Sequence, residues 1–194
     1  MSMKKQLKSS EYCLGAEEIK KIIYAAANFR DRCLIKALAH TAIRRAELAS
    51  LDIRDIDFER HLLQIREGKG GKSRTVPISE ELASDLKHLN GNRKSGPIFL
   101  SQRKGPLTLR QVNWIVAQVG IASGVKNPNP GCKYITCHLF RHSFAREWKK
   151  RGGSIESLSK ILGHTSVKTT LDEYGTEDLP TVSENYRKII SQVF

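Results

Sequence analysis

The chain has 194 residues, with 33 lysines and arginines against 20 aspartates and glutamates, a formal net charge of +13. This length predicts one domain, and so large a positive excess favours a polyanionic partner, nucleic acid first, over a surface that is basic only for solubility. No apolar run approaches the roughly 18 residues of a membrane span, and the N-terminal MSMKKQLKSSEY lacks the apolar centre of a secretory signal, so a cytoplasmic protein is expected.

Helical periodicity runs through most of the chain. In chain order, the predicted helices are residues 16–28, 30–41, 44–51, 79–89, 108–123, 137–151, 155–162, 166–174 and 179–193. Ser79 and Thr108 are the expected N-caps of two of them, and Gly163 is an expected C-cap. The last helix, 179–193, carries its apolar residues on one side, so it needs a surface to pack on.

Between the third and fourth helices the pattern changes to that of β-strands. Residues 61–67 and 73–78 are predicted as two strands that flank GKGG, residues 68–71, a tight glycine turn. Pro77 lacks an N–H group, so the second strand is expected to lie at an edge of the sheet or to end there. Helices before and after one small antiparallel sheet predict an α+β domain that is mostly helical.

Two basic residues in the first half of the chain are candidates for phosphate chemistry. Arg44 begins a short helix with Glu47 three residues on, a spacing that either orients the guanidinium or forms an ordinary surface ion pair. Lys69 lies at the tip of the GKGG turn, where it either enters a cleft and delivers a proton or stays solvated. The G-x-x-x-x-G-K-[ST] spacing of a Walker P-loop is absent.

The stretch HLFRHSF places His138, Arg141 and His142 on one side of a predicted helix. A guanidinium can bind two phosphate oxygens at once, and the imidazole of His138, one turn away, can reach the same phosphate or an attacking hydroxyl. The two histidines also raise the alternative of a zinc site with Cys132 and Cys137. The spacing C-x4-C-H-x3-H matches no common zinc finger, however, and we expect no metal.

Two residues further along complete the candidate set. His164, in LGHTS, follows a glycine cap and precedes a helix N-terminus, a favourable place for an anion, although a capping or packing histidine would have the same surroundings. Tyr174, in LDEYG, ends a short helix beside Gly175, where a lone tyrosine is most often part of a core or its rim. Neither residue is diagnostic alone.

Together these residues follow the order R…K…H-x-x-R…H…Y, and with it the sequence resembles the catalytic domain of the tyrosine recombinases, the phage-integrase and Xer group. The matching segments are TAIRRAELASLDIRDIDF (41–58), IREGKGGKSRTVPIS (65–79), HLFRHSFA (138–145) and LGHTSVKTTLDEYG (162–175). Ala42 departs from the family pattern, which usually has glycine there. Residues 1–13 are too few to hold the helical core-binding domain that most of the family carries.

The resemblance implies a catalytic role for six residues. They are Arg44, Lys69, His138, Arg141, His164 and Tyr174. In the family, the arginines clamp the phosphate, the lysine protonates the leaving 5′-oxygen, and the tyrosine attacks phosphorus to form a 3′-phosphotyrosyl link, with no metal, ATP or other cofactor. The cations are expected to favour the Tyr174 phenolate, and His138 to accept its proton. Glu47 is expected to support Arg44, while His142 either supports the His138 ring or fills a polar niche.

The function implied by the resemblance is a site-specific DNA recombinase that binds double-stranded DNA as a homo-oligomer, a dimer to a tetramer. Residues 14–178 are its expected catalytic domain, residues 1–13 a basic segment or linker, and residues 179–194 a C-terminal helix that packs either on its own domain or on a neighbouring protomer. The alternatives are DNA relaxation like that of a type IB topoisomerase and a non-catalytic DNA-binding regulator on the same fold. The presence of all six catalytic residues argues against the regulator.

Overall fold

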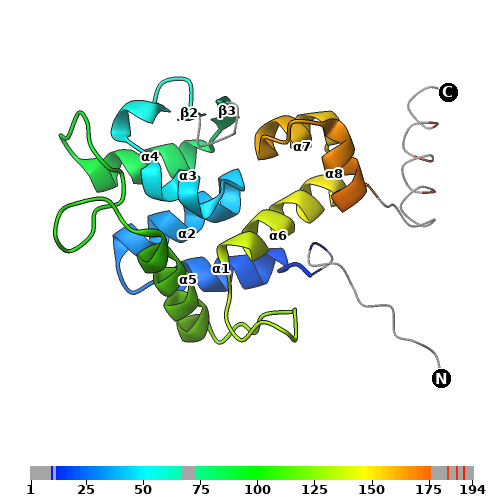
Figure 1. The fold of residues 1–194 in the computed structure, drawn as a ribbon, viewed down its shortest axis with the longest axis horizontal. Helices are drawn as coiled ribbons and strands as arrows, with labels where there is room; N and C mark the ends of the chain where they lie inside the picture. Colours follow the sequence, from blue (N-terminus) through cyan, green and yellow to red (C-terminus); the bar gives the residue numbers. More distant parts are fainter. Residues whose placement is uncertain are drawn as a thin grey trace.

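The computed structural model describes residues 10, 12–66 and 73–175, together with positions 183, 187 and 190. Within these residues the chain forms eight α-helices and a three-stranded antiparallel sheet (Figure 1). The helices are α1 (Ala16–Tyr24), α2 (Phe29–Thr41), α3 (Arg45–Ser50), α4 (Glu80–Asn90), α5 (Leu109–Ser123), α6 (Cys137–Lys150), α7 (Ile155–Leu162) and α8 (Val167–Tyr174). The strands are β1 (Ile56–Asp57), β2 (Leu62–Ile65) and β3 (Arg74–Pro77). This arrangement confirms the predicted α+β fold, mostly helical with one small sheet.

Six of the eight described helices begin at a residue whose side chain caps them, the exceptions being α1 and α3. The hydroxyl of Ser79 accepts a hydrogen bond from the N–H of Leu82. The hydroxyl of Thr108 does the same for the N–H of Gln111, so both predicted N-caps are confirmed. Other helices are capped by side chains of the same kinds, namely Asn28, Thr136, Ser154 and Ser166. Gly163 ends α7 in the left-handed conformation, with φ of 66°, as predicted for a C-cap.

Of the predicted helices, one ends earlier than expected and one lies mostly outside the described residues. The first helix ends at Tyr24 rather than at residue 28, because the side chain of Asn28 accepts the N–H of Asp31 and starts α2 there. Most of the predicted C-terminal helix, 179–193, lies outside the described residues. No helix within the described part of the chain has the length and apolarity needed to cross a membrane.

The sheet has the order β1-β2-β3, with both pairs antiparallel. β3 is therefore an edge strand and Pro77 is its last residue, which confirms the prediction made from the missing N–H. Both strands of the predicted pair are shorter than expected, and the sequence does not predict β1, because two residues cannot show an alternating pattern. The turn at 68–71 lies outside the described residues.

The central helix of the core is α2, most of whose residues are buried. It packs against α1, α3, α4 and α6. α6 in turn packs against α7, which also contacts α8 and β3, and Figure 1 shows α7 and α8 grouped beside α6. The turn between α2 and α3 and the end of α7 are thereby brought to the same helix, α6, which carries the HLFRHSF stretch.

Candidate active site

Arg44 occupies the N-cap position of α3, and Glu47 lies one turn into that helix. The exposed Arg44 guanidinium donates from Nη1 to Glu47 Oε1 over 3.0 Å, and the Arg44 backbone N–H donates to Oε2 over 2.7 Å. The same carboxylate accepts hydrogen bonds from both Nη atoms of Arg74, each at 2.8 Å. Glu47 therefore joins the start of α3 to strand β3 in addition to contacting Arg44.

The Glu47 carboxylate keeps its charge in this position. Burial by itself raises the pKa of this carboxyl, but the hydrogen bonds from Arg74 and from the backbone of Arg44 outweigh burial and lower the pKa to about 2. One carboxylate is thus shared between two arginines.

Arg141, near the middle of α6, is only 5% exposed. Its Nη1 donates to the carbonyl oxygen of Ala42 over 2.6 Å, and its Nη2 donates to that of Leu162 over 2.7 Å. These carbonyls stand at the C-termini of α2 and α7, where the aligned peptide dipoles concentrate negative charge. Burial and then the charge of Arg44 lower the pKa of Arg141 to about 10, so the guanidinium remains charged at neutral pH.

Ala42 explains how one of these carbonyls reaches Arg141. Its φ is 53°, in the left-handed region that strongly favours glycine. This conformation ends α2 and starts the turn that leads to Arg44. The glycine usual in the family at this position therefore has a conformational reason, and the alanine here adopts the left-handed turn that glycine would favour.

His164 follows the end of α7 and is half-buried. Its Nε2 lies 3.2 Å from Arg141 Nη2, and its Nδ1 lies 2.7 Å from the hydroxyl of Thr170. Because a guanidinium can only donate, Nε2 is the unprotonated acceptor, and Nδ1 carries the proton that Thr170 accepts. Burial and then the charge of Arg141 lower the pKa of His164, which agrees with this neutral form.

Tyr174 is the last residue of α8 and is completely buried, with 0% of its surface exposed. Its hydroxyl lies 2.7 Å from Nδ1 of His142. The histidine at the phenol is thus His142, one turn further along α6 than His138, the residue expected to accept the proton.

The environment of Tyr174 also reverses an expectation about its ionisation. Its pKa is raised, first by burial and then by the charge of Glu173, while the opposing effect of Arg141 is smaller. The prediction that the clustered cations favour the phenolate is therefore wrong for this conformation, because removing the phenolate from water costs more than the nearby cation recovers.

His138 lies at the surface end of this group of rings. Its ring stacks on that of His142 with a centroid distance of 6.0 Å. Partial desolvation, followed by the charge of Arg141, lowers the pKa of His138. It also lines an open pocket of about 390 Å³ together with Arg45 and Asn113. His138 is thus a neutral histidine with access to solvent, whereas His142 is enclosed.

Lys69 lies outside the described residues, so its role stays a prediction.

Arg74 is a site residue that the sequence did not single out, because it looks like an ordinary strand residue in SRTVPI. Besides its bonds to Glu47, its Nε donates to the carbonyl of Ile161 over 2.8 Å. A Cβ added at Gly163 would lie 2.8 Å from the Arg74 Cδ, so the glycine before His164 leaves the space that Arg74 fills.

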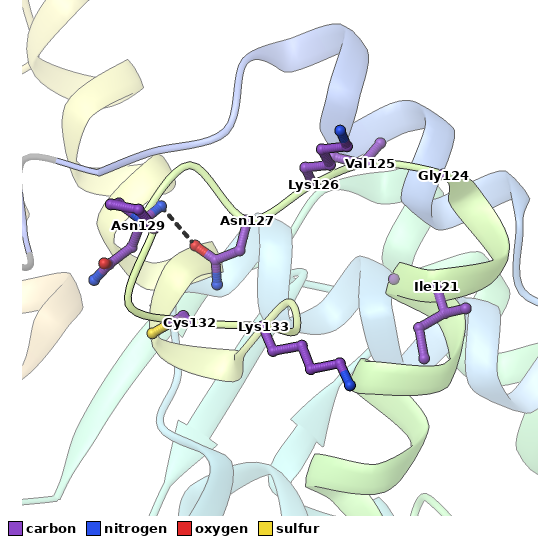
Figure 2. A pocket seen from close by; sticks show the side chains of 10 residues that line it. Ile121, Gly124, Val125, Lys126, Asn127, Asn129, Cys132 and Lys133 are labelled. Carbon is purple, nitrogen blue, oxygen red and sulfur yellow. Dashed lines mark hydrogen bonds between the residues drawn. The ribbon is translucent and has the colours of Figure 1, made fainter.

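The cysteines considered for zinc lie in different places. Cys137 is buried at the start of α6, with its thiol 3.8 Å from Asn113 Oδ1 and its pKa raised to about 11 by burial. Cys132 belongs to the loop after α5, where Figure 2 shows it with Lys133 at a separate pocket of about 350 Å³. Within the described residues, no three His, Cys, Asp or Glu side chains form a group that could hold a metal ion.

Four side chains together define a class of site. Arg141 is a fixed, buried arginine and Arg44 is a second arginine at the surface. His164 is a neutral histidine bound to Arg141, and Tyr174 lies at the end of α8. On a mostly helical α+β domain, this is a set of groups that phosphoryl transfer to a tyrosine would use. The chain belongs to the phage integrase family, whose sequence model matches residues 13–178. The family inferred from the motifs is therefore confirmed.

The chain is similar to several recombinases. "Tyrosine recombinase XerA" of Pyrococcus horikoshii is 34% identical over 168 residues, which cover 84% of this chain and 56% of that protein, so this chain spans little more than half its length. A crystal structure of XerA recombinase matches with a TM-score of 0.76 at 30% identity, covering 91% of this chain and 64% of that one. The structure of XerH site-specific recombinase bound to difH substrate matches with a TM-score of 0.70 at 25% identity, covering 94% and 56%.

Proposed function

We propose that this chain is the catalytic domain of a site-specific DNA recombinase, which cuts and rejoins double-stranded DNA through a 3′-phosphotyrosyl link on Tyr174. The proposal rests above all on Arg141, whose buried guanidinium keeps its charge between two helix ends beside His164. A cation fixed in this way needs no reorganisation when a phosphate arrives. The relatives support the same activity, since one is named a tyrosine recombinase and another was solved on its DNA substrate.

In the proposed reaction, the Tyr174 oxygen attacks phosphorus, so that a phosphotyrosyl bond forms and the bond from phosphorus to the 5′-oxygen breaks. The phenol proton passes to a base, and the departing 5′-oxygen takes a proton, which the family resemblance assigns to Lys69. Arg44 and Arg141 offset the charge that develops on the non-bridging oxygens. Rejoining to a different 5′-hydroxyl reverses these steps, so bond energy is kept and no nucleotide cofactor is consumed.

Arg141 keeps donors free for this task. A guanidinium has five N–H groups, of which the carbonyls of Ala42 and Leu162 take one each and His164 Nε2 faces another. The remaining donors can bind phosphate oxygens. His164 can donate to the same phosphate only after Nε2 gains a proton, which a nearby phosphate anion would favour.

The proposed partner is double-stranded DNA in the cytoplasm, bound by a homo-oligomer of two to four copies. The net charge of +13 supports a polyanionic partner. The C-terminal segment, 179–194, has apolar residues on one side in its sequence, and we propose that it joins neighbouring protomers on the DNA.

Covalent cleavage is the direct test of this function. The substrate is a pool of nicked duplexes with randomised sequence around the nick, designed so that cleavage releases a short 5′-hydroxyl fragment and the adduct accumulates. A denaturing gel is expected to show protein bound covalently to DNA, and sequencing of the trapped DNA gives the target site. Tyr174→Phe is expected to abolish the adduct, because the attacking oxygen is missing, while DNA binding persists.

Three other outcomes would contradict parts of this proposal. An adduct that persists in Tyr174→Phe would refute the assignment of the nucleophile. A wild-type protein that binds the pool yet forms no adduct would indicate the non-catalytic regulator. Trapped sequences without any consensus, together with relaxation of supercoiled plasmid, would indicate the topoisomerase-like alternative.

A further inference from the structure

His142 is the residue of the HLFRHSF stretch to which the family resemblance gives no role. It is 8% exposed and lies on α6 between the ring of His138 and the ring of Tyr174. Its Nδ1 is 2.7 Å from the Tyr174 hydroxyl and 3.6 Å from Glu173 Oε1. The imidazole is therefore the buried polar partner of the proposed nucleophile.

The Tyr174 hydroxyl cannot attack a phosphate from this position. The side chain is 0% exposed, whereas a DNA phosphate must approach from the surface, where Arg44 is exposed. Attack requires the oxygen to come within about 3–3.5 Å of phosphorus. The hydroxyl must therefore leave His142 before the reaction, and the hydrogen bond between them is lost in that step.

Two other contacts at this end of α8 hold the backbone rather than the phenol. Lys149 Nζ donates to the carbonyl of Tyr174 over 2.6 Å, and the hydroxyl of Ser10 donates to the carbonyl of Glu173 over 3.3 Å. These bonds fix where the helix ends, but they leave the tyrosine side chain to its own partners. The bond to His142 acts on the reacting atom itself, and the neighbouring Glu173 carboxylate also interacts with this hydroxyl and helps to raise its pKa.

We propose that His142 is a positioning residue that holds the Tyr174 hydroxyl in its buried place and so sets how readily the nucleophile is released to the phosphate. This proposal rests on the proposed function. His142 thereby differs from His138, because it acts on the tyrosine before the attack and not on the phosphate.

Loss of this hydrogen bond should favour release. A hydrogen bond of ordinary net strength changes an equilibrium by about two- to tenfold. His142→Leu fills similar space without a partner for the hydroxyl, so it should raise the released population by about that factor. In His142→Asn the side-chain amide stands near the place of Nδ1 and should restore the bond, whereas in His142→Gln it stands nearer the place of Nε2 and should not.

The first measurement uses the protein without DNA. N-acetylimidazole acetylates accessible tyrosine hydroxyls, and mass spectrometry of the peptides gives the rate at each tyrosine, with the 71% exposed Tyr24 as internal reference. Relative to Tyr24, Tyr174 should react about two- to tenfold faster in His142→Leu and His142→Gln than in wild type, and at nearly the wild-type rate in His142→Asn. Equal Tyr174 rates in all of these proteins would overturn the proposal. Thermal melts check folding, and the Gln–Asn comparison carries the test if the leucine variant does not fold.

The second measurement is single-turnover adduct formation at saturating concentrations of the nicked DNA. Faster adduct formation in His142→Leu and His142→Gln, with restoration in His142→Asn, is the expected result. Unchanged or slower formation in the first two would overturn the proposal and would place His142 in the chemical step instead. If wild-type protein forms no adduct with any DNA, the proposed function fails, while the acetylation rates still decide whether His142 holds the tyrosine.

Discussion

Glu47 is a single side chain that holds two arginines of the candidate site. Its carboxylate is 16% exposed and accepts hydrogen bonds from the guanidinium groups of both Arg44 and Arg74. Because these bonds exist only in the folded protein, they lower the pKa of Glu47 to about 2 from an ordinary value of 4.5. A group whose pKa is lowered by folding stabilises the protein above its unfolded pKa, and this contribution is lost as the pH falls toward the folded pKa.

The consequence is a specific loss of stability in acid. We expect Glu47→Gln to lower the free energy of unfolding at neutral pH by an amount on the order of 2 kcal/mol. The difference from wild type should shrink as the pH falls from 4.5 to about 2, because wild type loses the contribution there and the variant has none to lose. Urea unfolding at a series of pH values measures it, and a difference that stays constant across that range would contradict the prediction.

At the scale of secondary-structure elements, Arg74 connects three pieces that are far apart in sequence. It extends from β3, donates from both Nη atoms to the carboxylate of Glu47 on α3, and donates from Nε to the carbonyl of Ile161 on α7. Gly163, just after α7, leaves room for its side chain. Since Arg44 belongs to the start of α3 and His164 to the end of α7, Arg74 keeps these two parts of the site in register.

We therefore expect Arg74→Lys to affect catalysis more than DNA binding. A lysine cannot reproduce the paired bonds to Glu47 together with the bond to Ile161, so adduct formation should slow by about tenfold or more and unfolding should become easier by about 1–2 kcal/mol. Single-turnover gels, DNA-binding titrations and thermal melts measure the three quantities.

Arg54→Lys is the matched control. Arg54 also binds a carboxylate through two nitrogens, that of Asp52, but its side chain is 61% exposed. Its replacement should leave both the melting temperature and the adduct rate nearly unchanged, because water screens an exposed ion pair. Equal effects of the two substitutions would mean that Arg74 contributes only as an ordinary surface ion pair.

At the scale of the whole molecule, charge is the dominant feature. In the proposed DNA complex, the net charge of +13 favours contacts to DNA phosphates, and each such contact releases counterions when it forms. Binding that depends on such contacts does not require Tyr174, the proposed nucleophile. Affinity and catalysis should therefore respond to different changes.

Varying the salt concentration tests whether DNA binding depends on contacts to phosphates. The affinity for a duplex of random sequence should fall by about 100-fold or more between about 50 and 200 mM salt, with a linear plot of log affinity against log salt concentration. Tyr174→Phe should give the same slope as wild type, because a phenol makes no charged contact. Fluorescence anisotropy measures both, and a fall of less than about threefold would contradict a phosphate-based interface.

The sequence by itself predicted most of the helices, two of the three strands, the family and most residues of the candidate site. Helix starts at Ser79 and Thr108, the C-cap at Gly163 and the edge strand at Pro77 follow from neighbours in the chain, because capping, periodicity and a missing N–H are local properties. The order of the motifs likewise indicated the family. These local rules did not predict β1 or the early end of α1. Two residues are too few to show a period, and the cap at Asn28 competes with continuation of the first helix.

Only the tertiary structure decided what the site residues contact. The bond from Arg141 to Ala42 joins positions 99 residues apart, that from Arg74 to Glu47 joins positions 27 apart, and that from His142 to Tyr174 joins positions 32 apart. Such pairs depend on how the helices and the sheet pack together, and no local pattern encodes them. Burial, which also arises only on packing, reversed the expected ionisation of Tyr174 and gave His142, the histidine without a family role, its position at the phenol.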